Sequence, residues 1–157
     1  MKQLANIVVK KLVKKKLKIS FAESCTGGML SSCITSVNGS SKIFTLCIIT
    51  YSNRSKIDLL KIPKKMISNY GAVSEQVCTA MVKNVNKIAK TKMSVSITGI
   101  AGPKGGSKKK PVGLVYIGIK KGHEISVRKY LFKNKGRSYI QKTSVIKCLR
   151  LILSFLK

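Results

Sequence analysis

The sequence predicts an α/β fold, a three-layer α/β/α sandwich with a mixed central sheet. Patterns typical of helices alternate with patterns typical of strands along most of the 157 residues. Late in the chain, two strand patterns follow each other across a short turn, which indicates an antiparallel hairpin within the sheet. With 44% hydrophobic residues the chain is globular, and its length suits a single domain over residues 1–157.

The first half of the chain is expected to fold as helix, strand, helix and strand. Residues 1–18 predict an amphipathic helix docked on the core, because lysines separate apolar residues at helical spacing: Leu4, Ile7, Val8 and Leu12. Residues 17–22 predict a short strand and residues 28–36 a helix. The run KIFTLCIITYS, residues 42–52, has branched and aromatic residues and no Gly or Pro, which predicts a strand buried on both faces.

Two helices are expected in the middle of the chain. SKIDLLKI, residues 55–62, predicts a short helix that Pro63 ends. Ser74 is a good N-cap for the next helix, and Glu75 favours its positive end. The apolar stripe expected to face the core of that helix consists of Val77, Met81, Val85 and Ile88.

The last third predicts three strands and a closing helix. Residues 93–101 form the first strand, and 102–111 a loop rich in Gly, Pro and Lys. Residues 112–120 and 124–132 are expected to pair as the hairpin, because only Lys121, Gly122 and His123 separate them. From Ser138 onward, helical spacing recurs in Val145, Cys148, Leu149, Ile152, Phe155 and Leu156.

The charge of the chain is strongly positive. Lys and Arg number 32 against 4 Asp and Glu, a formal net charge of +28. Such a charge favours anionic partners: nucleic acid, a membrane surface or phosphorylated metabolites. Most basic residues are lysines scattered along the chain, which favours a compositional bias over a dedicated nucleic-acid surface. Nonspecific contact with nucleic acid, by a basic module without catalysis, remains the alternative function.

The cysteines and the single histidine do not form a metal-binding pattern. None of the five cysteines forms a CxxC pair, and His123 is the only histidine, so zinc-ligand spacing is absent. The odd number of cysteines favours reduced thiols and a cytoplasmic location. No apolar run is long enough to span a bilayer. We expect no metal and no cofactor.

Three loops follow predicted strands, where ligands bind in α/β folds. In the loop 23–28, Ser24 precedes two glycines that open a helix, so its hydroxyl is expected beside free backbone N–H groups able to hold a phosphate or an oxyanion. A serine at this position is also a common helix cap. Cys25 is the rival nucleophile, because a thiol near a helix N-terminus can have a depressed pKa.

The other two loops add a base and a flexible backbone. In the loop 51–56, Tyr51 ends a strand and Lys56 follows one helical turn later. A lysine in a partly dry pocket loses its proton more readily and can act as general base for a serine; the alternative is one more solvated lysine. The glycines of the loop 98–106 allow close approach to a ligand, without the spacing of a P-loop or of GxGxxG.

Five stretches give the chain a family resemblance: AESCTGG (22–28), GSS (39–41), TYSNRSKIDLL (50–60), YGAVSE (70–75) and TGIAGPKGGSKKKPVGLVYIG (98–118). In this order they resemble the C-terminal domain of the competence-damage-inducible protein CinA, a family with nicotinamide-nucleotide amidase activity. Longer members carry an additional N-terminal domain. The resemblance therefore leads us to expect a stand-alone amidase that assembles as a homo-oligomer, as its relatives do.

The resemblance implies hydrolysis of nicotinamide mononucleotide to nicotinic acid mononucleotide and ammonia. It implies Ser24 as nucleophile, Lys56 as its base and Tyr51 beside the pair, with oxyanion donors among the N–H groups of residues 25–28. Residues expected to bind the phosphorylated substrate are Glu23, Cys25, Thr26, Gly27, Gly28, Ser41, Thr98, Gly99, Gly102 and Arg137. Arg137 matches an arginine that follows Gly-Asp in many relatives; here the order is Lys135-Gly136-Arg137, without the acidic neighbour.

Overall fold

The computed structural model describes residues 1–157, the whole chain, as a five-stranded sheet with helices on both faces. The elements in chain order are α1 (Lys2–Lys14), β1 (Ile19–Glu23), α2 (Met29–Thr35), the 3₁₀ helix η1 (Ser40–Lys42), β2 (Phe44–Ile49), α3 (Asn53–Leu60), α4 (Lys64–Tyr70), α5 (Glu75–Ala89), β3 (Met93–Gly99), β4 (Leu114–Lys121), β5 (Glu124–Leu131) and α6 (Arg137–Ser154).

The sheet is mixed, as predicted. Its strand order is β2-β1-β3-β4-β5. β1 pairs in parallel with both β2 and β3, while β3, β4 and β5 pair antiparallel in sequence. The predicted hairpin is confirmed, with Lys121 opposite Glu124 at its turn. The carboxyl ends of β1, β2 and β3 therefore lie at the same end of the sheet.

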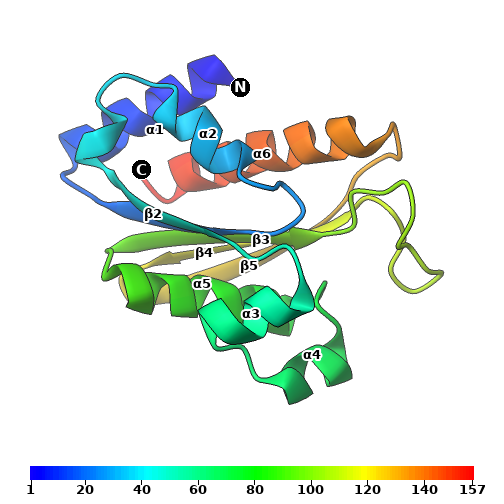
Figure 1. Cartoon of the computed structure of the whole chain (residues 1–157). Helices are drawn as coiled ribbons and strands as arrows, with labels where there is room; N and C mark the ends of the chain where they lie inside the picture. The colour runs from blue at the N-terminus through cyan, green and yellow to red at the C-terminus, as the bar shows by residue number, and fades with distance from the viewer.

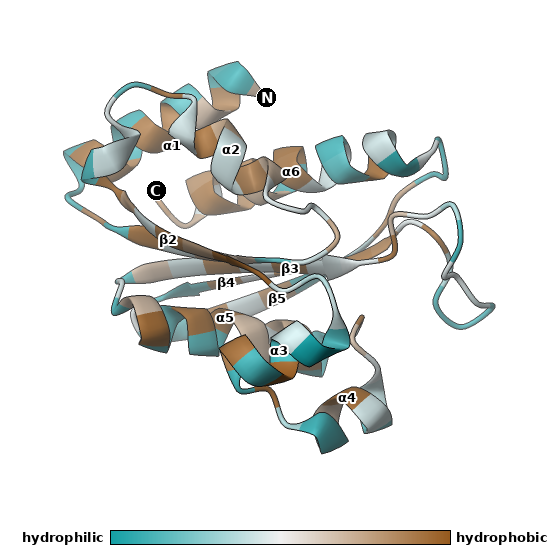
Figure 2. Ribbon diagram, in the orientation of Figure 1, coloured by the Kyte–Doolittle hydropathy of each residue, from teal (hydrophilic) through white to brown (hydrophobic).

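Helices cover both faces of the sheet and complete the three layers (Figure 1). α1, α2 and α6 contact one another on one face, and α5 lies along the other face with α3 and α4 beside it. The larger core, of 25 buried residues, includes residues from α1, α2, α6 and all strands except β2 and β5; a smaller one includes Ala22 and apolar residues of α3 to α5. Figure 2 shows the apolar residues concentrated on the surfaces that face between the layers.

Hydroxyl side chains of β3 form hydrogen bonds with α5 and with the segment just before it. Ser94 and Ser96 donate to backbone carbonyls of that helix, and Thr98 donates to Ala72 just before it. These three side chains alternate with Met93, Val95 and Ile97 of the larger core. β3 is thus buried on both faces, and its small residues allow α5 to lie close to the sheet.

The structure corrects the burial predicted for β2. The strand covers Phe44–Ile49 rather than 42–52, and no residue in it is fully buried. Its place at the edge of the sheet explains the difference, because an edge strand has a neighbour on one side only. Ile49, at its end, is 47% exposed.

Two apolar stripes are also corrected. In α1 the buried residues are Ala5, Val8, Val9 and Leu12. At 100° per residue these define a face from which Ile7 points away, and Ile7 is exposed. In α5 the stripe is buried through Val85, but Ile88 in the last turn is exposed. The sequence analysis missed α4, which begins directly after Pro63, and the short η1.

Candidate active site

Three loops at the carboxyl ends of the parallel strands surround one pocket. Ser24 follows β1, Tyr51 follows β2 and Gly99 ends β3, while Arg137 enters from the first turn of α6. The pocket has a volume of about 420 Å³. Its lining residues are Ser24, Cys25, Tyr51, Asn53, Gly99, Ile100, Ala101, Gly102, Lys104, Gly105 and Arg137.

Ser24 and Lys56 lie in contact beneath this pocket. The Lys56 Nζ donates to Ser24 Oγ at 2.9 Å and to the backbone carbonyl of Thr50 at 2.7 Å. Lys56 is only 1% exposed, so it is not a solvated surface lysine. Its position follows from the start of α3, where the Ser52 hydroxyl accepts from the Ser55 N–H and caps the helix. Lys56 then falls in the first turn, facing the loop after β1.

Burial lowers the proton affinity of the Lys56 amine below that of an ordinary lysine. Loss of hydration lowers the pKa of Lys56 from 10.5 to about 8. About a tenth of the side chains are then neutral at pH 7, and half at pH 8. The dominant cause is desolvation by burial, as expected for a lysine in a partly dry pocket. A neutral amine at this distance can accept the Ser24 proton.

Cys25 is poorly suited to act as nucleophile. Cys25 is 6% exposed, and burial raises the pKa of its thiol to about 12. It therefore stays protonated at neutral pH, whereas the reactive species of a cysteine is the thiolate. His123, the only histidine, lies in the turn between β4 and β5, at the far end of β4 from the pocket. Of the two neighbouring candidates, the geometry favours Ser24.

Glu23 does not line the pocket; its carboxylate binds backbone and side-chain donors inside the protein. The side chain is fully buried. Its carboxylate accepts hydrogen bonds from the Thr26 hydroxyl at 2.7 Å and from the N–H groups of Gly28, Leu30 and Ser31 at 3.1, 3.1 and 2.8 Å. Glu23 thus occupies the positive end of α2, where we expected a substrate anion.

The same contacts narrow the set of oxyanion donors. The Gly28 N–H is bound to Glu23, and the Gly27 N–H donates to the Ser24 carbonyl at 3.0 Å. Neither glycine lines the pocket, and neither does Thr26. The N–H groups of Cys25 and Thr26 have no acceptor in the chain. Of the four N–H groups expected, these two therefore remain as candidate oxyanion donors, Cys25 as a residue of the pocket lining and Thr26 as its buried neighbour in the loop.

Arg137 connects two of the three loops. Its guanidinium donates to the Gly102 carbonyl at 3.0 Å and to the Tyr51 hydroxyl, and lies 5.9 Å from the centre of the Tyr51 ring. The absent acidic neighbour is not needed to hold the side chain, because a carbonyl and a phenol hydroxyl do so. The remaining N–H groups of Arg137 leave capacity for an anion.

The structure does not place all the predicted binding residues at the pocket. Ser41 is exposed in η1, which precedes β2, so it lies at the opposite end of the sheet. Thr98 is 1% exposed, and its hydroxyl donates to the Ala72 carbonyl. Gly99 does line the pocket and is required by packing, because a Cβ there would lie 2.6 Å from Val115 Cγ2.

Sequence reasoning missed several residues at the site. Asn53 and Lys104 line the pocket. Both stand inside stretches that carry the family resemblance, Asn53 in the first turn of α3 and Lys104 in the glycine-rich loop, yet neither differs in type from the other polar residues nearby. The Thr50 carbonyl, which accepts from Lys56, leaves no signal in the sequence because any residue has a carbonyl.

Three further findings concern the cysteines, the metal-ligating side chains and the helices. All five cysteines are free thiols. No cluster of three or more His, Cys, Asp or Glu side chains is present. None of the helices combines the length and the apolar character needed to cross a bilayer.

The fold and the site together define a class of protein: an α/β/α sandwich with a buried serine–lysine pair at the carboxyl ends of its parallel strands. The model of the CinA C-terminal domain family matches residues 1–156, and the chain belongs to this family.

Relatives and solved structures agree with this assignment. The chain is 48% identical over 155 residues to a CinA-like protein of Prochlorococcus marinus subsp. pastoris, covering 96% of the chain and 36% of that protein. It is 42% identical to a putative competence-damage inducible protein of Thermoanaerobacter, covering 98% of the chain and 37% of that protein. The chain thus spans little more than a third of the length of these relatives. A crystal structure of the competence/damage inducible protein CihA from Agrobacterium tumefaciens superposes with a TM-score of 0.97 at 31% identity, over 99% of this chain and 95% of that one.

Proposed function

We propose that this chain is an amidohydrolase that converts nicotinamide mononucleotide to nicotinic acid mononucleotide and ammonia, in pyridine nucleotide salvage. The observation that carries the proposal is the 2.9 Å contact between Lys56 Nζ and Ser24 Oγ at the base of a pocket. A serine with an adjacent lysine of lowered pKa is a suitable nucleophile and base for acyl transfer. The resemblance to the amidases of the family supplies the substrate.

The reaction proceeds in two halves. Neutral Lys56 takes the Ser24 proton while Oγ bonds to the carboxamide carbon, and the N–H groups of Cys25 and Thr26 stabilise the oxyanion. When the C–N bond breaks, the proton held by Lys56 passes to the leaving nitrogen, either directly or through the Tyr51 hydroxyl, which gives up its own proton and takes the one from Lys56. The nitrogen departs as ammonia. Water then attacks the acyl-ester with Lys56 again as base, the acid leaves, and Ser24 regains its proton.

The charges around the pocket support a phosphorylated small molecule as substrate. Lys104 and Arg137 line the pocket, and no carboxylate does. The N–H groups of Ala101, Gly102, Lys104 and Gly105 have no acceptor in the chain, so the glycine-rich loop can donate to phosphate oxygens. This loop extends beyond the end of the sheet, beside the entrance to α6 (Figure 1).

Ammonia release from nicotinamide mononucleotide tests the proposal. Ser24→Ala and Lys56→Met are expected to reduce kcat by at least about 1,000-fold, because each removes a group that acts on the reacting atoms. The matched controls are Ser32→Ala in α2 and Lys65→Met in α4, both at exposed positions, which should retain wild-type rates. Equal rates in all five proteins would show that Ser24 and Lys56 do not form the catalytic pair.

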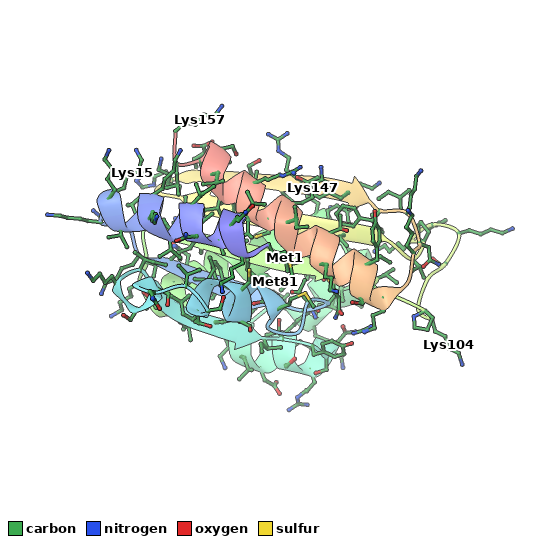
Figure 3. The ribbon with its side chains drawn as sticks, turned by 90° about the horizontal axis from the view of Figure 1, so that it is seen from above. Met1, Lys15, Met81, Lys104, Lys147 and Lys157 are labelled. Carbon is green, nitrogen blue, oxygen red and sulfur yellow. The ribbon has the colours of Figure 1, made fainter.

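The net charge supports a second candidate function, nonspecific binding of nucleic acid. The chain has one salt bridge, between Arg54 and Asp58, so almost all of its basic side chains have no acidic partner. Figure 3 shows Lys15 and Lys104 at opposite ends of the molecule, so the basic residues are not confined to one end. Binding that weakens steeply with salt in a protein that releases no ammonia would favour this function.

We also propose that the chain works in the cytoplasm as a homo-oligomer. Five free thiols suit a reducing compartment. The formal charge of +28 on each subunit opposes association through self-repulsion. Light scattering across a salt series measures the assembly: a multimer that forms more readily as salt rises supports it, and a monomer at every salt concentration contradicts it.

A further inference from the structure

One hydrogen bond at the site has no part in the steps above. In α6, the Gln141 Nε2 donates to the Cys25 backbone carbonyl at 2.8 Å, across 116 residues of sequence. Gln141 lies four residues after Arg137, so both project from the same side of α6. The Gln141 side chain does not line the pocket, so any influence on the reaction is indirect.

The Cys25 carbonyl depends on this contact. The Ser24 carbonyl accepts from Gly27 N–H, and the Thr26 carbonyl accepts from Met29 N–H, so the loop itself satisfies both. No other donor in the chain reaches the Cys25 carbonyl. Of these three carbonyls it is therefore the one held from outside the loop.

The direction of the Cys25 carbonyl also sets the direction of an N–H group. The Cys25 C=O and the Thr26 N–H belong to the same planar trans peptide unit, in which they point in opposite directions. Holding the carbonyl on α6 consequently fixes where the Thr26 N–H points. That N–H and the N–H of Cys25 are the two free donors beside Ser24.

We propose that Gln141 is a positioning residue for the oxyanion donors: it fixes the Cys25–Thr26 peptide so that the donors meet the oxyanion formed on attack by Ser24. The proposal rests on the proposed function in requiring Ser24 as nucleophile. It gives α6 a defined part in the site. Arg137 holds the loops after β2 and β3, and Gln141 holds the loop after β1.

Substitution of Gln141 tests the role through kcat. Gln141→Leu removes the donor, and we expect kcat to fall about 10- to 100-fold with KM within about twofold, because the donors act on the transition state. The pH at half-maximal rate should stay near 8, since the contacts of Lys56 are unchanged. Gln141→Lys restores a donor of sufficient length and should recover most of kcat. Lys142→Leu, at an exposed position next in α6, is the matched control.

Three results would overturn the role of Gln141. They are an unchanged kcat in Gln141→Leu, a loss confined to KM, and a Gln141→Lys variant as slow as Gln141→Leu. Urea unfolding of each variant identifies any loss of folded protein, and rates are then compared per folded molecule.

Labelling of Ser24 by a fluorophosphonate separates this proposal from the identity of the substrate. The probe needs an active serine and oxyanion donors but no nicotinamide nucleotide. If wild-type protein is labelled at Ser24 but releases no ammonia, the proposed substrate is wrong while Gln141 is still tested. Labelling of Gln141→Leu should then be about 10-fold or more slower, and an equal rate contradicts the proposal. If wild-type Ser24 is not labelled at all, the nucleophile and the role of Gln141 are both overturned.

Discussion

Replacing Lys56 by methionine should change how the stability of the protein depends on pH. The folded protein holds the pKa of Lys56 at about 8, against 10.5 ordinarily. Between these values the unfolded chain binds a proton that the folded chain does not, so wild-type stability rises with pH. Keeping Lys56 protonated in its buried position costs stability. Above pH 10.5 Lys56 is neutral in both states and this penalty is absent, whereas below pH 8 it is protonated in both states and the penalty is complete. At about 1.4 kcal/mol per pKa unit, the penalty at pH 7 is up to about 3 kcal/mol.

Urea unfolding at constant ionic strength, from pH 7 to pH 10.5, measures this penalty. Lys56→Met also leaves the Thr50 carbonyl without its donor, which shifts its stability by a constant amount at every pH. The change of the free energy of unfolding with pH is therefore the diagnostic quantity. Over this range the free energy of unfolding of wild type should rise by up to about 3 kcal/mol relative to that of Lys56→Met. Lys65→Met, at an exposed position, should run parallel to wild type. If wild type and Lys56→Met also run parallel, the Lys56 amine is not poorly hydrated in the folded protein.

Three further substitutions test neighbouring groups. Glu23→Gln should lower the free energy of unfolding by about 2 kcal/mol or more, since its amide presents a donor to the N–H groups that now bind the carboxylate; an unchanged urea midpoint would contradict its capping role. Cys25→Ala should leave kcat within about twofold, because the thiol stays protonated, and loss of ammonia release would restore it as nucleophile. Arg137→Met should raise KM at least about tenfold for a phosphorylated nucleotide and less for the nucleoside, and an equal change in both would exclude a contact with phosphate.

The layers of the fold could be predicted because each strongly patterned segment has one dominant signal. Ser74 marks the start of α5, and the Lys121–His123 turn marks the hairpin. Burial was harder to predict, since the apolar run of β2 does not reveal that the strand lies at an edge. α4 follows Pro63, which we used as a helix end although proline also suits the position before a helix.

The candidate site could also be predicted only in part. The loops that meet could be predicted, because the carboxyl ends of parallel strands lie together. The roles of individual hydroxyls and carboxylates could not. Glu23 binds the end of α2, and Thr98 binds Ala72, only because of distances set by the whole fold. Backbone groups such as the Thr50 and Cys25 carbonyls leave no signal in a sequence.

The proposed reaction depends on attack by Ser24 on the substrate. It is tested most directly by quenching the protein in acid during turnover of nicotinamide mononucleotide and mapping any covalent acyl group by peptide mass spectrometry. We expect an acyl-ester on Ser24 that is absent from Ser24→Ala. Turnover with the acyl group on Cys25, or turnover that persists in Ser24→Ala, would contradict it.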